Sequence, residues 1–528
     1  MRSFIAELWS DGTLKRILLV GVAFHALAAW RTYGFYSPDE HFQLLELARF
    51  KLGLGGVGGL PWEFHERIRP SLQPTLACGM IGALRELGVA NPFTQATVLR
   101  FVSGILSLCS LLFVLQAFFQ DLPSRRLRRW LLGLGLLLWF VPFLNVRFSS
   151  ETWSAALMLA AVGLIKRTSG HGLRARTALA LGGLLGLAFL FRYQTALMGL
   201  GALAWLLLAK KERPAALGTV LGAGAAVLAL GLALDRWFYG EWVLTPWNYF
   251  RANLIEGKAS SFGTSPWWDY FLLVLQGATH PIGAMILLSF LAFWVLYPRS
   301  IITWVTLPFF AVHLLIPHKE LRFLFPMANL AAIAFVLSIR SLHEKGLLDR
   351  LGLPGSRPRA WLTAAFLLVN APALLAASVL PASFVLNPAR YIYEHYGHSQ
   401  AILLYRKGDP YPYGLGGEEP RLLFYKPETI TEQPIESTAE IERHLSDHSR
   451  VLFFTLRKET SPPPRLRVQG ARCPVVMRTP QWVLDNLNVG GWVEELGYPV
   501  LYECFGSAAP DRPRSREEPS ERVPDSRT

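Results

Sequence analysis

Long apolar stretches recur through the first 380 residues, and short polar connections separate them. A helix needs roughly 20 apolar residues to cross the hydrocarbon core of a bilayer. Stretches close to that length occupy residues 17–34, 96–119, 130–147, 151–166, 176–192, 196–209, 214–235, 278–297, 301–317, 321–340 and 360–380. The pattern predicts an α-helical multi-pass membrane protein with about 11 transmembrane helices.

Positive charge gives these helices an orientation, because Lys and Arg in short loops mark the cytoplasmic side of a membrane. Lys15 and Arg16 precede the first span. Further basic residues fall in every second connection, at positions 125–129, 166–176, 210–213, 299 and 340–359. Residues 71–90 are apolar enough to be a further span, but a crossing there would invert the rest of the chain. We therefore predict that they form a re-entrant or interface-lying helix.

Beyond residue 380 the pattern changes and predicts a small soluble α/β domain over residues 381–505. Strand-like runs alternate there with polar helical runs, the former at residues 401–405, 451–456 and 499–505 and the latter at 437–446 and 481–487. An odd number of crossings after a cytoplasmic N-terminus puts this domain on the extracytoplasmic side. Cys473 and Cys504 can pair there if the compartment is oxidising. Residues 506–528 are too polar to bury a core and are predicted to be a disordered tail.

Composition separates the same two parts. Of all residues, 52% are hydrophobic and only 17% are charged, whereas about a quarter are charged in soluble domains. Residues 1–380 hold 34 Lys and Arg against 18 Asp and Glu, and the remainder holds 18 against 20. The first part therefore has a net charge of +16 and the remainder of −2, so the basic excess belongs to the membrane part, where it reports topology, and no nucleic-acid partner is predicted.

Two adjacent carboxylates stand out in the first external loop, residues 35–95. Asp39 and Glu40 directly follow Pro38 at the outer end of the first span. A carboxylate at that place can act as a general base that removes a proton from an attacking hydroxyl. The structural alternative is that Asp39 caps a helix that runs from Glu40 to Phe50. Both can hold, because a capped helix start also fixes the carboxylate in place.

A second cluster, His318-Lys319-Glu320-Leu321-Arg322, lies in the last external connection. Arginine can bind a phosphate bidentately and lysine binds it as a point charge. The alternative is that these cations extend to the lipid headgroups. Arg192 has the same two interpretations, while Glu151 is interpreted as a structural partner of Arg147, one turn earlier. Ionisable groups at membrane depth are costly, so their concentration on one side makes them functional candidates.

Four tracts in this order resemble the signatures of a known family: Pro38-Asp39-Glu40-His41-Phe42-Gln43 with Glu46, Trp62-Glu63-Phe64, Arg69-Pro70-Ser71, and His318-Lys319-Glu320-Leu321-Arg322-Phe323 with Pro326. They resemble tracts of the dolichyl- or polyprenyl-phosphate-mannose-dependent α-mannosyltransferases of GPI-anchor and N-glycan assembly. The resemblance implies a C-type glycosyltransferase fold, a lipid-phosphate-linked mannose donor, a glycan or glycolipid acceptor, and no nucleotide-sugar site. It also implies that Asp39 occupies the place of the catalytic acidic residue.

The chemistry that the resemblance implies gives the polar residues three roles. Asp39 takes the proton of the acceptor hydroxyl, and Glu40 orients the acceptor or shares that proton. The residues predicted to bind the donor phosphate are His318, Lys319, Arg322 and Arg192, and those predicted to bind the acceptor or sugar are Trp62, Glu63, Arg69 and Gln43. A single displacement would invert the anomeric carbon. Because cations stabilise the departing phosphate, the scheme requires neither a metal nor another cofactor.

Two other functions fit parts of the pattern. A transporter or flippase of lipid-linked sugars would use a similar basic, aromatic-lined external cavity, although the sequence lacks the paired repeats with matching broken helices that are common in transporters. A transferase of the same fold that uses another lipid-phosphate sugar also fits. The Arg-rich short loops favour the bacterial cytoplasmic membrane as the location, or the endoplasmic reticulum membrane if the source is eukaryotic.

Overall fold

The computed structural model describes residues 2–350, 356–411, 421–488 and 490–506. The chain forms two compact units, one of residues 1–384 and one that begins at Val385. The division falls close to the predicted domain boundary at residue 380. The predicted disordered tail lies almost wholly outside the described residues, which end at Gly506.

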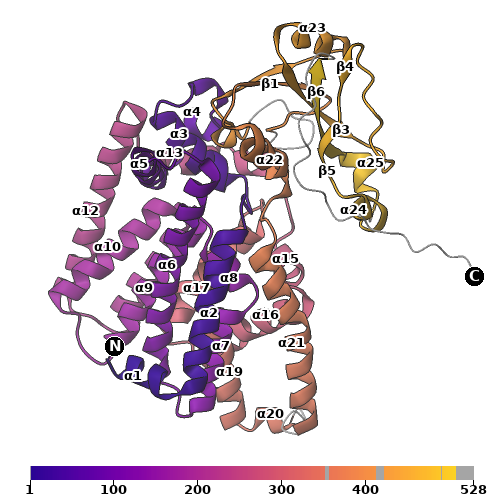
Figure 1. Ribbon diagram of the computed structural model, residues 1–528. Helices are drawn as coiled ribbons and strands as arrows, with labels where there is room; N and C mark the ends of the chain where they lie inside the picture. The colour runs from indigo at the N-terminus through magenta and orange to yellow at the C-terminus, as the bar shows by residue number, and fades with distance from the viewer. Residues whose placement is uncertain (1, 351–355, 412–420, 489, 507–528) are drawn as a thin grey trace, which may run out of the picture. The chain divides into compact units, whose positions relative to one another are not determined.

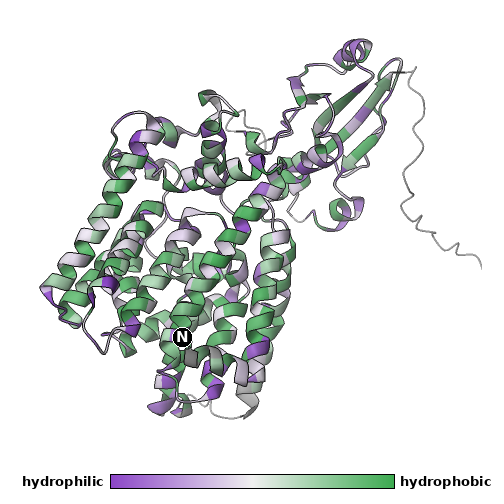
Figure 2. Cartoon of the chain, turned by 60° about the vertical axis from the view of Figure 1, so that its left-hand side comes forward, coloured by the Kyte–Doolittle hydropathy of each residue, from purple (hydrophilic) through white to green (hydrophobic). Residues whose placement is uncertain are grey.

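The first unit is a bundle of apolar helices. Its long helices are α2 (Gly12–Arg31), α6 (Pro92–Phe119), α9 (Ser150–Arg167), α10 (Ala175–Phe191), α12 (Pro214–Tyr239), α16 (His280–Leu296), α17 (Ile301–Leu315), α19 (Ala331–Glu344) and α21 (Ser356–Val379). Figure 1 shows these helices packed along one another, and hydrophobic residues cover most of their length in Figure 2. The predicted α-helical class with a small C-terminal α/β domain is confirmed.

Polar side chains set the points where several of these helices begin. Asp11, Asn91 and Ser149 accept hydrogen bonds from backbone N–H groups in the first turns of α2, α6 and α9. Short polar side chains at such positions satisfy donors that have no partner within the helix. These caps lie where the chain passes from a polar connection to an apolar stretch, so the hydrophobic pattern locates the helix starts.

The number of membrane crossings stays a prediction. By length and composition alone, the described residues hold four helical segments suited to crossing a membrane, or five with a bent pair counted as one span. The four are Gly12–Arg31, Pro92–Phe119, Pro214–Tyr239 and Ala360–Tyr396. Shorter apolar helices fall within other predicted spans, at Ala175–Phe191, Tyr193–Ala209, His280–Leu296 and Ile301–Leu315.

The prediction of one continuous helix over residues 130–147 is wrong. The segment forms α7 (Arg125–Leu137) and α8 (Phe140–Asn145), with a break between them. Asn370 of α21 bridges the break, because its Nδ2 donates to the Leu137 carbonyl (2.7 Å) and its Oδ1 accepts from the Trp139 N–H (2.9 Å). The backbone groups that the break exposes are thus satisfied by a side chain from another helix.

The prediction of one continuous helix over residues 321–340 is also wrong. A 3-10 turn, η6 (Leu321–Leu324), and α18 (Phe325–Ala328) precede α19, and the two parts are bent by 63°. Pro326 stands in the first turn of α18, where its missing N–H is tolerated. The bend has a functional consequence, because it places Arg322 in a turn at the end of the bundle.

The short elements of the first external loop gather at one end of the bundle. They are η1 (His41–Glu46), α3 (Leu47–Lys51), η2 (Val57–Gly59), α4 (Trp62–His65) and α5 (Leu72–Glu86), together with α13 (Thr245–Phe250) from a later connection. Figure 1 shows α5 nearly end-on, across the direction of the long helices, and α5 packs against α3 and η1. We call this the polar end of the bundle, and the interface-lying character of α5 stays a prediction.

The second unit is built on a mixed sheet with the strand order β2-β1-β3-β6-β4, in which β5 also pairs with β6. The strands are β1 (Ala401–Arg406), β2 (Ile430–Pro434), β3 (Arg450–Arg457), β4 (Ala471–Arg472), β5 (Val475–Arg478) and β6 (Tyr498–Gly506). Strands β1, β2 and β3 are parallel, whereas β6 is antiparallel to β3. The helices of this unit are α22 (Asn387–Tyr396), α23 (Ala439–Asp447), α24 (Gln481–Asn486) and α25 (Trp492–Leu496). The three predicted strands and two predicted helices are confirmed, and β2, β4 and β5 were missed.

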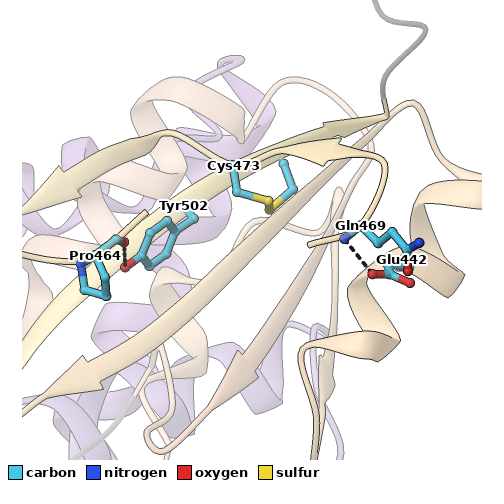
Figure 3. The surroundings of a disulfide bond; sticks show 6 residues. Glu442, Pro464, Gln469, Cys473 and Tyr502 are labelled. Atoms are coloured by element: carbon cyan, nitrogen blue, oxygen red, sulfur yellow. Dashed lines mark hydrogen bonds between the residues drawn. A yellow bond between two sulfur atoms is a disulfide. The ribbon is translucent and has the colours of Figure 1, made fainter. Parts of the chain in front are cut away.

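Cys473 and Cys504, whose pairing the sequence left open, form a disulfide that ties β6 to the segment between β4 and β5 (Figure 3). The Tyr502 hydroxyl on β6 donates to the Pro464 carbonyl (3.2 Å) nearby. Cys504 also belongs to the apolar core of this unit. The disulfide therefore reinforces a strand that the hydrophobic core already holds.

Candidate active site

Asp39 and Glu40 begin the first helix of the external loop, and their roles differ. Glu40 turns back, and its Oε1 accepts from the backbone N–H groups of Tyr36 (3.1 Å) and Ser37 (3.4 Å). These N–H groups precede the helix, and the capping role that the sequence suggested for Asp39 is not seen among the described residues. The Asp39 side chain is directed instead toward two arginines at the polar end of the bundle.

Asp39 lies between Arg322 and Arg69. Its Oδ2 accepts a short hydrogen bond from the Arg322 guanidinium, and the Arg69 Nη2 is 3.6 Å away. Burial raises the pKa of the Asp39 carboxyl, but Arg322 and Arg69 outweigh it and bring the pKa below its usual value. The Asp39 side chain keeps 22% of its surface exposed. The carboxylate is thus ionised, held by cations and open to a small ligand.

The Glu40 carboxyl has the opposite electrostatic environment. Burial raises the pKa of this carboxyl to about 7. The positive charge of Arg147 opposes the rise, and the negative charge of Glu151 adds to it. Glu40 is 9% exposed and its Oε2 is 4.0 Å from the Arg147 guanidinium. Near neutral pH this group is divided between its two protonation states, which suits a proton-sharing group.

Arg322 is the centre of the ion-pair network. Its guanidinium binds Glu320 bidentately, with Nε to Oε2 at 2.5 Å and Nη2 to Oε1 at 2.9 Å. Its Nη1 faces Asp39 and is 3.5 Å from the Glu151 Oε1. Arg322 is 8% exposed. A planar fork that already binds carboxylates in this way can bind a phosphate with the same geometry.

Arg192 joins the network through Glu151. Its Nη1 donates to the Glu151 Oε1 (2.7 Å) and to the Ser150 hydroxyl (3.0 Å). The structure therefore brings Arg192, Glu151, Arg322 and Asp39 together. The observed ion pairs of Glu151 are with Arg192 and Arg322. Both partners are far from Glu151 in the sequence, so sequence spacing did not indicate these pairs.

His318 and Lys319 lie beside this network and have other partners. The His318 Nε2 is 3.0 Å from the Glu320 Oε1, so His318 helps to hold the acid that binds Arg322. The Lys319 Nζ donates to the carbonyls of Ile316 (2.6 Å) and Ser265 (3.3 Å). Lys319 precedes η6 and its ammonium holds backbone carbonyls, so its role in phosphate binding stays a prediction.

Three of the four predicted sugar-binding residues adjoin Asp39. The Gln43 Nε2 donates to the Glu63 Oε1 (3.1 Å), and the Arg69 Nη2 lies 3.5 Å from the same oxygen. The Trp62 ring has other contacts: it stacks on Phe262 at 6.1 Å and carries the Lys258 ammonium over its face at 4.2 Å. The structure thus joins Gln43, Glu63 and Arg69 to Asp39, whereas the Trp62 ring contacts Phe262, which packs against His318 beside the network (6.1 Å).

Two residues of α12 that the sequence analysis did not select hold the Arg69-Pro70-Ser71 tract. The Asp235 Oδ1 accepts from the Ser71 backbone N–H (2.9 Å) and hydroxyl (2.6 Å), and the Tyr239 hydroxyl donates to the Arg69 carbonyl (2.7 Å). Asp235 is 4% exposed. The signal that could have found it is its charge at the end of an apolar stretch, since ionisable groups there are costly.

An apolar cavity of about 440 Å³ lies next to the network. Its lining includes Tyr36, three residues before Asp39, and Leu321, which precedes Arg322. Aromatic and aliphatic side chains line the rest, among them Trp139, Phe143 and Phe325. The chain thus puts an apolar cavity beside a cluster of arginines and carboxylates.

Among the described residues, no group of three or more His, Cys, Asp and Glu side chains is arranged to hold a metal ion. That the chemistry needs no metal stays a prediction.

Comparisons with known proteins find similarity to mannosyltransferases. The model of the Alg9-like mannosyltransferase family matches residues 16–389. The chain is 29% identical over 338 residues to Mannosyltransferase APTG1 of Arabidopsis thaliana, which covers 61% of this chain and 58% of that protein. It is 26% identical over 310 residues to GPI alpha-1,2-mannosyltransferase 3 of Bos taurus, covering 58% and 56%.

The matched region therefore spans a little over half the length of these curated relatives. Among solved structures, ArnT from Cupriavidus metallidurans bound to undecaprenyl phosphate is 13% identical, with 84% of this chain and 93% of that chain covered and a TM-score of 0.47.

Proposed function

We propose that this chain, which belongs to the Alg9-like mannosyltransferase family, transfers mannose from a polyprenyl-phosphate-linked donor to a hydroxyl of a glycan or glycolipid acceptor. The observation that carries the proposal is the Asp39 carboxylate held between Arg322 and Arg69 beside an apolar cavity. A base, phosphate-binding cations and an apolar cavity are the three parts that a lipid-phosphate sugar requires.

The donor lipid explains why the cavity and the arginines are neighbours. The isoprenoid chain would lie in the apolar cavity, whose lining includes Tyr36 and Leu321. Its phosphate would then reach Arg322 at the polar end. Burial of apolar surface supplies affinity without directional contacts. Arg322 then supplies the directional contact, because its fork matches the oxygens of a phosphate.

Binding of the phosphate would also prepare Asp39 for its role. Arg322 now lowers the pKa of the Asp39 carboxyl, which makes Asp39 a weak base. When the phosphate shares the Arg322 guanidinium, Asp39 loses part of that attraction and its pKa rises toward the ordinary value. Asp39 is therefore the stronger base when the donor is in place.

The reaction is a single displacement at the anomeric carbon. The acceptor oxygen forms a bond to that carbon, its proton passes to the Asp39 carboxylate, and the bond to the phosphate oxygen breaks with the electron pair remaining on the phosphate. Arg322 and Arg192 stabilise the departing charge in a site partly closed to water. A β-linked donor gives an α-linked product.

The location and the acceptor are further parts of the proposal. We place the polar end of the bundle and the second unit on the extracytoplasmic side of a bacterial cytoplasmic membrane, or the luminal side of the endoplasmic reticulum if the source is eukaryotic. The relatives are named as mannosyltransferases, and one of them as a GPI alpha-1,2-mannosyltransferase. A glycolipid acceptor of that general class is the first to test.

The experiment is a donor comparison with the purified full chain in detergent. Transfer of labelled mannose is measured from polyprenyl-phosphate mannose, nucleotide mannose and another polyprenyl-phosphate hexose, with a set of glycolipid acceptors. We expect transfer from the polyprenyl-phosphate mannose and its loss in Asp39→Asn, but not in Asp121→Asn, whose carboxylate pairs with Lys166 (2.8 Å) away from the network. Preference for nucleotide mannose would overturn the proposal, and so would movement of lipid-linked sugar across vesicles without any transfer.

A further inference from the structure

Gln73 has a buried side chain that nothing in the described structure explains. It lies in the first turn of α5, two residues after the Ser71 that Asp235 holds, and it is 2% exposed. Among the residues that the structure describes, neither its Oε1 nor its Nε2 has a hydrogen-bond partner. Buried amides are nearly always paired, because an unpaired one has lost its water without compensation. A group with both atoms unpaired therefore indicates a missing partner.

The Gln73 amide lines a small pocket with both arginines that flank the network. The pocket has a volume of about 20 Å³, and Arg69, Arg192, Gln43 and Tyr249 also line it. The Nε atoms of Arg69 and Arg192 are likewise buried without a partner. Residues that line the pocket thus carry unused donors, on two guanidinium groups and one amide, together with one unused acceptor, the Gln73 Oε1.

The mixture of donors and acceptor selects the chemistry of the ligand. An anion would accept from the arginines but leave the Gln73 carbonyl unmatched, and an apolar group would match none of them. A hydroxyl can accept from the arginine N–H groups and donate to the Gln73 Oε1. The volume has room for one water-sized group, so a single hydroxyl fits and a whole sugar ring does not.

We propose that the pocket formed by Gln73, Arg69 and Arg192 binds one hydroxyl group of a hexose. This inference rests on the proposed function, and it names a group that recognises the sugar at that site. Arg69 adjoins Asp39 at 3.6 Å, so a hexose anchored here would lie within reach of the base. The hexose is either the one transferred or the terminal one of the acceptor, and the test separates them.

The test measures kcat and KM with single-deoxy hexoses in two series, one in the donor and one in the acceptor. We expect one deoxy analogue in one series to lose roughly 10- to 100-fold in kcat/KM with the unchanged chain, as a hydrogen bond to charged groups would. Gln73→Met keeps the length and removes both polar atoms. It should lose a similar factor with the parent sugar and almost nothing further with that analogue.

Gln95→Met is the matched control, because Gln95 is also buried, at 1% exposure, and its amide donates to the Val89 carbonyl (2.7 Å). It should keep the discrimination of the unchanged chain. Gln73→Asn retains the amide but withdraws it from the pocket, so it should show part of the effect even if Gln73→Met fails to fold. A uniform loss over all analogues would mean that Gln73 holds a structural water, and unchanged discrimination in both Gln73 variants would also overturn the inference.

Failure of the proposed function gives a different result. If the chain uses another lipid-phosphate hexose, the same analogues are made of that hexose, and loss of discrimination in Gln73→Met still supports the pocket. If no lipid-phosphate sugar is used, binding of methyl hexosides and their deoxy forms is measured by saturation-transfer NMR. Equal binding of all of them would then overturn the pocket independently of catalysis.

Discussion

Each unit of this protein contains a network of arginine and carboxylate groups, and the two networks differ in how completely their atoms are paired. In the second unit, Arg421 donates to Asp409 and, through Nη1 (2.8 Å) and Nη2 (2.6 Å), to Glu432. Lys426 adds a further bond to Glu432 (2.9 Å). In the first unit, Arg69 and Arg192 keep buried Nε atoms without partners.

We interpret the difference as that between a structural network and the binding network proposed above. Arg421 ties Glu432 on β2 to Asp409 in the loop after β1, and every nitrogen of its guanidinium is used. The network around Asp39 and Arg322 instead leaves capacity unused, in a place where an unpaired polar group is costly. A fold retains such a cost where a ligand can relieve it.

The strongest test of this contrast replaces one carboxylate in each network. Asp39→Asn removes the base and little volume, so transfer should fall by about 10²- to 10⁴-fold, the range for a general base, while the melting temperature stays close to that of the unchanged chain. Asp409→Asn should leave kcat/KM unchanged and lower the stability of the second unit by about 1–3 kcal/mol. Turnover assays and thermal melts of both variants test these expectations. Near-normal turnover in Asp39→Asn would mean that Asp39 is not the general base.

The next largest effect is expected from the arginines. Arg322→Lys keeps the charge and loses the planar fork, so donor-dependent kcat/KM should fall by roughly 10- to 150-fold, equivalent to about 1.5–3 kcal/mol. Arg299→Lys, remote from the network in sequence and in predicted topology, provides the control. Equal, small effects at the two positions would mean that Arg322 only contacts lipid headgroups.

Lys319→Gln should act mainly on stability, because the Lys319 ammonium binds backbone carbonyls.

These same residues show how much of the fold and of the candidate site the sequence alone predicts. The four motifs indicated the family, which the match over residues 16–389 confirms, and the hydrophobic periods located the helices and three strands. These signals are local, since they depend on the order of apolar and polar residues. The approach of Asp39 to Arg322 depends on contact between residues 283 apart. The predicted topology placed both residues on one side of the membrane, and the motif resemblance assigned them to one site.

What the sequence did not predict has physical reasons. The breaks near Trp139 and Leu321 were missed because an apolar composition does not show whether another helix will supply hydrogen-bond partners, as Asn370 does. Gln73 was missed because a buried amide looks like any polar residue near the start of a helix until its surroundings are known. Lys319 was grouped with Arg322 because both are cations of one short tract, and the tract alone does not show that the Lys319 ammonium binds backbone carbonyls.

A smaller effect is expected at the residue that positions Arg69. Asp235→Asn weakens the bonds from Ser71 to α12, so the Arg69 tract should gain mobility and kcat/KM should fall by roughly 2- to 12-fold, as for loss of one ordinary hydrogen bond of about 0.5–1.5 kcal/mol. A positioning role predicts a lower kcat with a similar KM for the donor lipid. Ser71→Ala should reproduce the effect, because it removes the 2.6 Å bond from the other side. A drop in melting temperature without any change in kcat would make Asp235 purely structural.

The smallest expected effect distinguishes the two networks by the sign of their pH dependence. Burial raises the pKa of Glu40 from 4.5 to about 7. A group whose pKa is raised by folding contributes stability below its unfolded pKa and loses it as the pH rises through the folded value. Burial also raises the pKa of Glu432, but Arg421 and Lys426 outweigh it and the net shift is downward. Glu432 therefore contributes stability above pH 4.5, which is lost as the pH falls below that value.

Melting curves of the full chain in detergent between pH 4 and 8 would show the two signs. With Glu40→Gln, the first unit should lose less stability between about pH 5 and 7.5. The difference in melting temperature should be a few degrees at most. Glu432→Gln should lower the stability of the second unit at neutral pH and flatten its decline in acid. If both variants changed the pH slope in the same direction, the two carboxylates would share one environment, and the distinction between an open and a closed network would lose its electrostatic support.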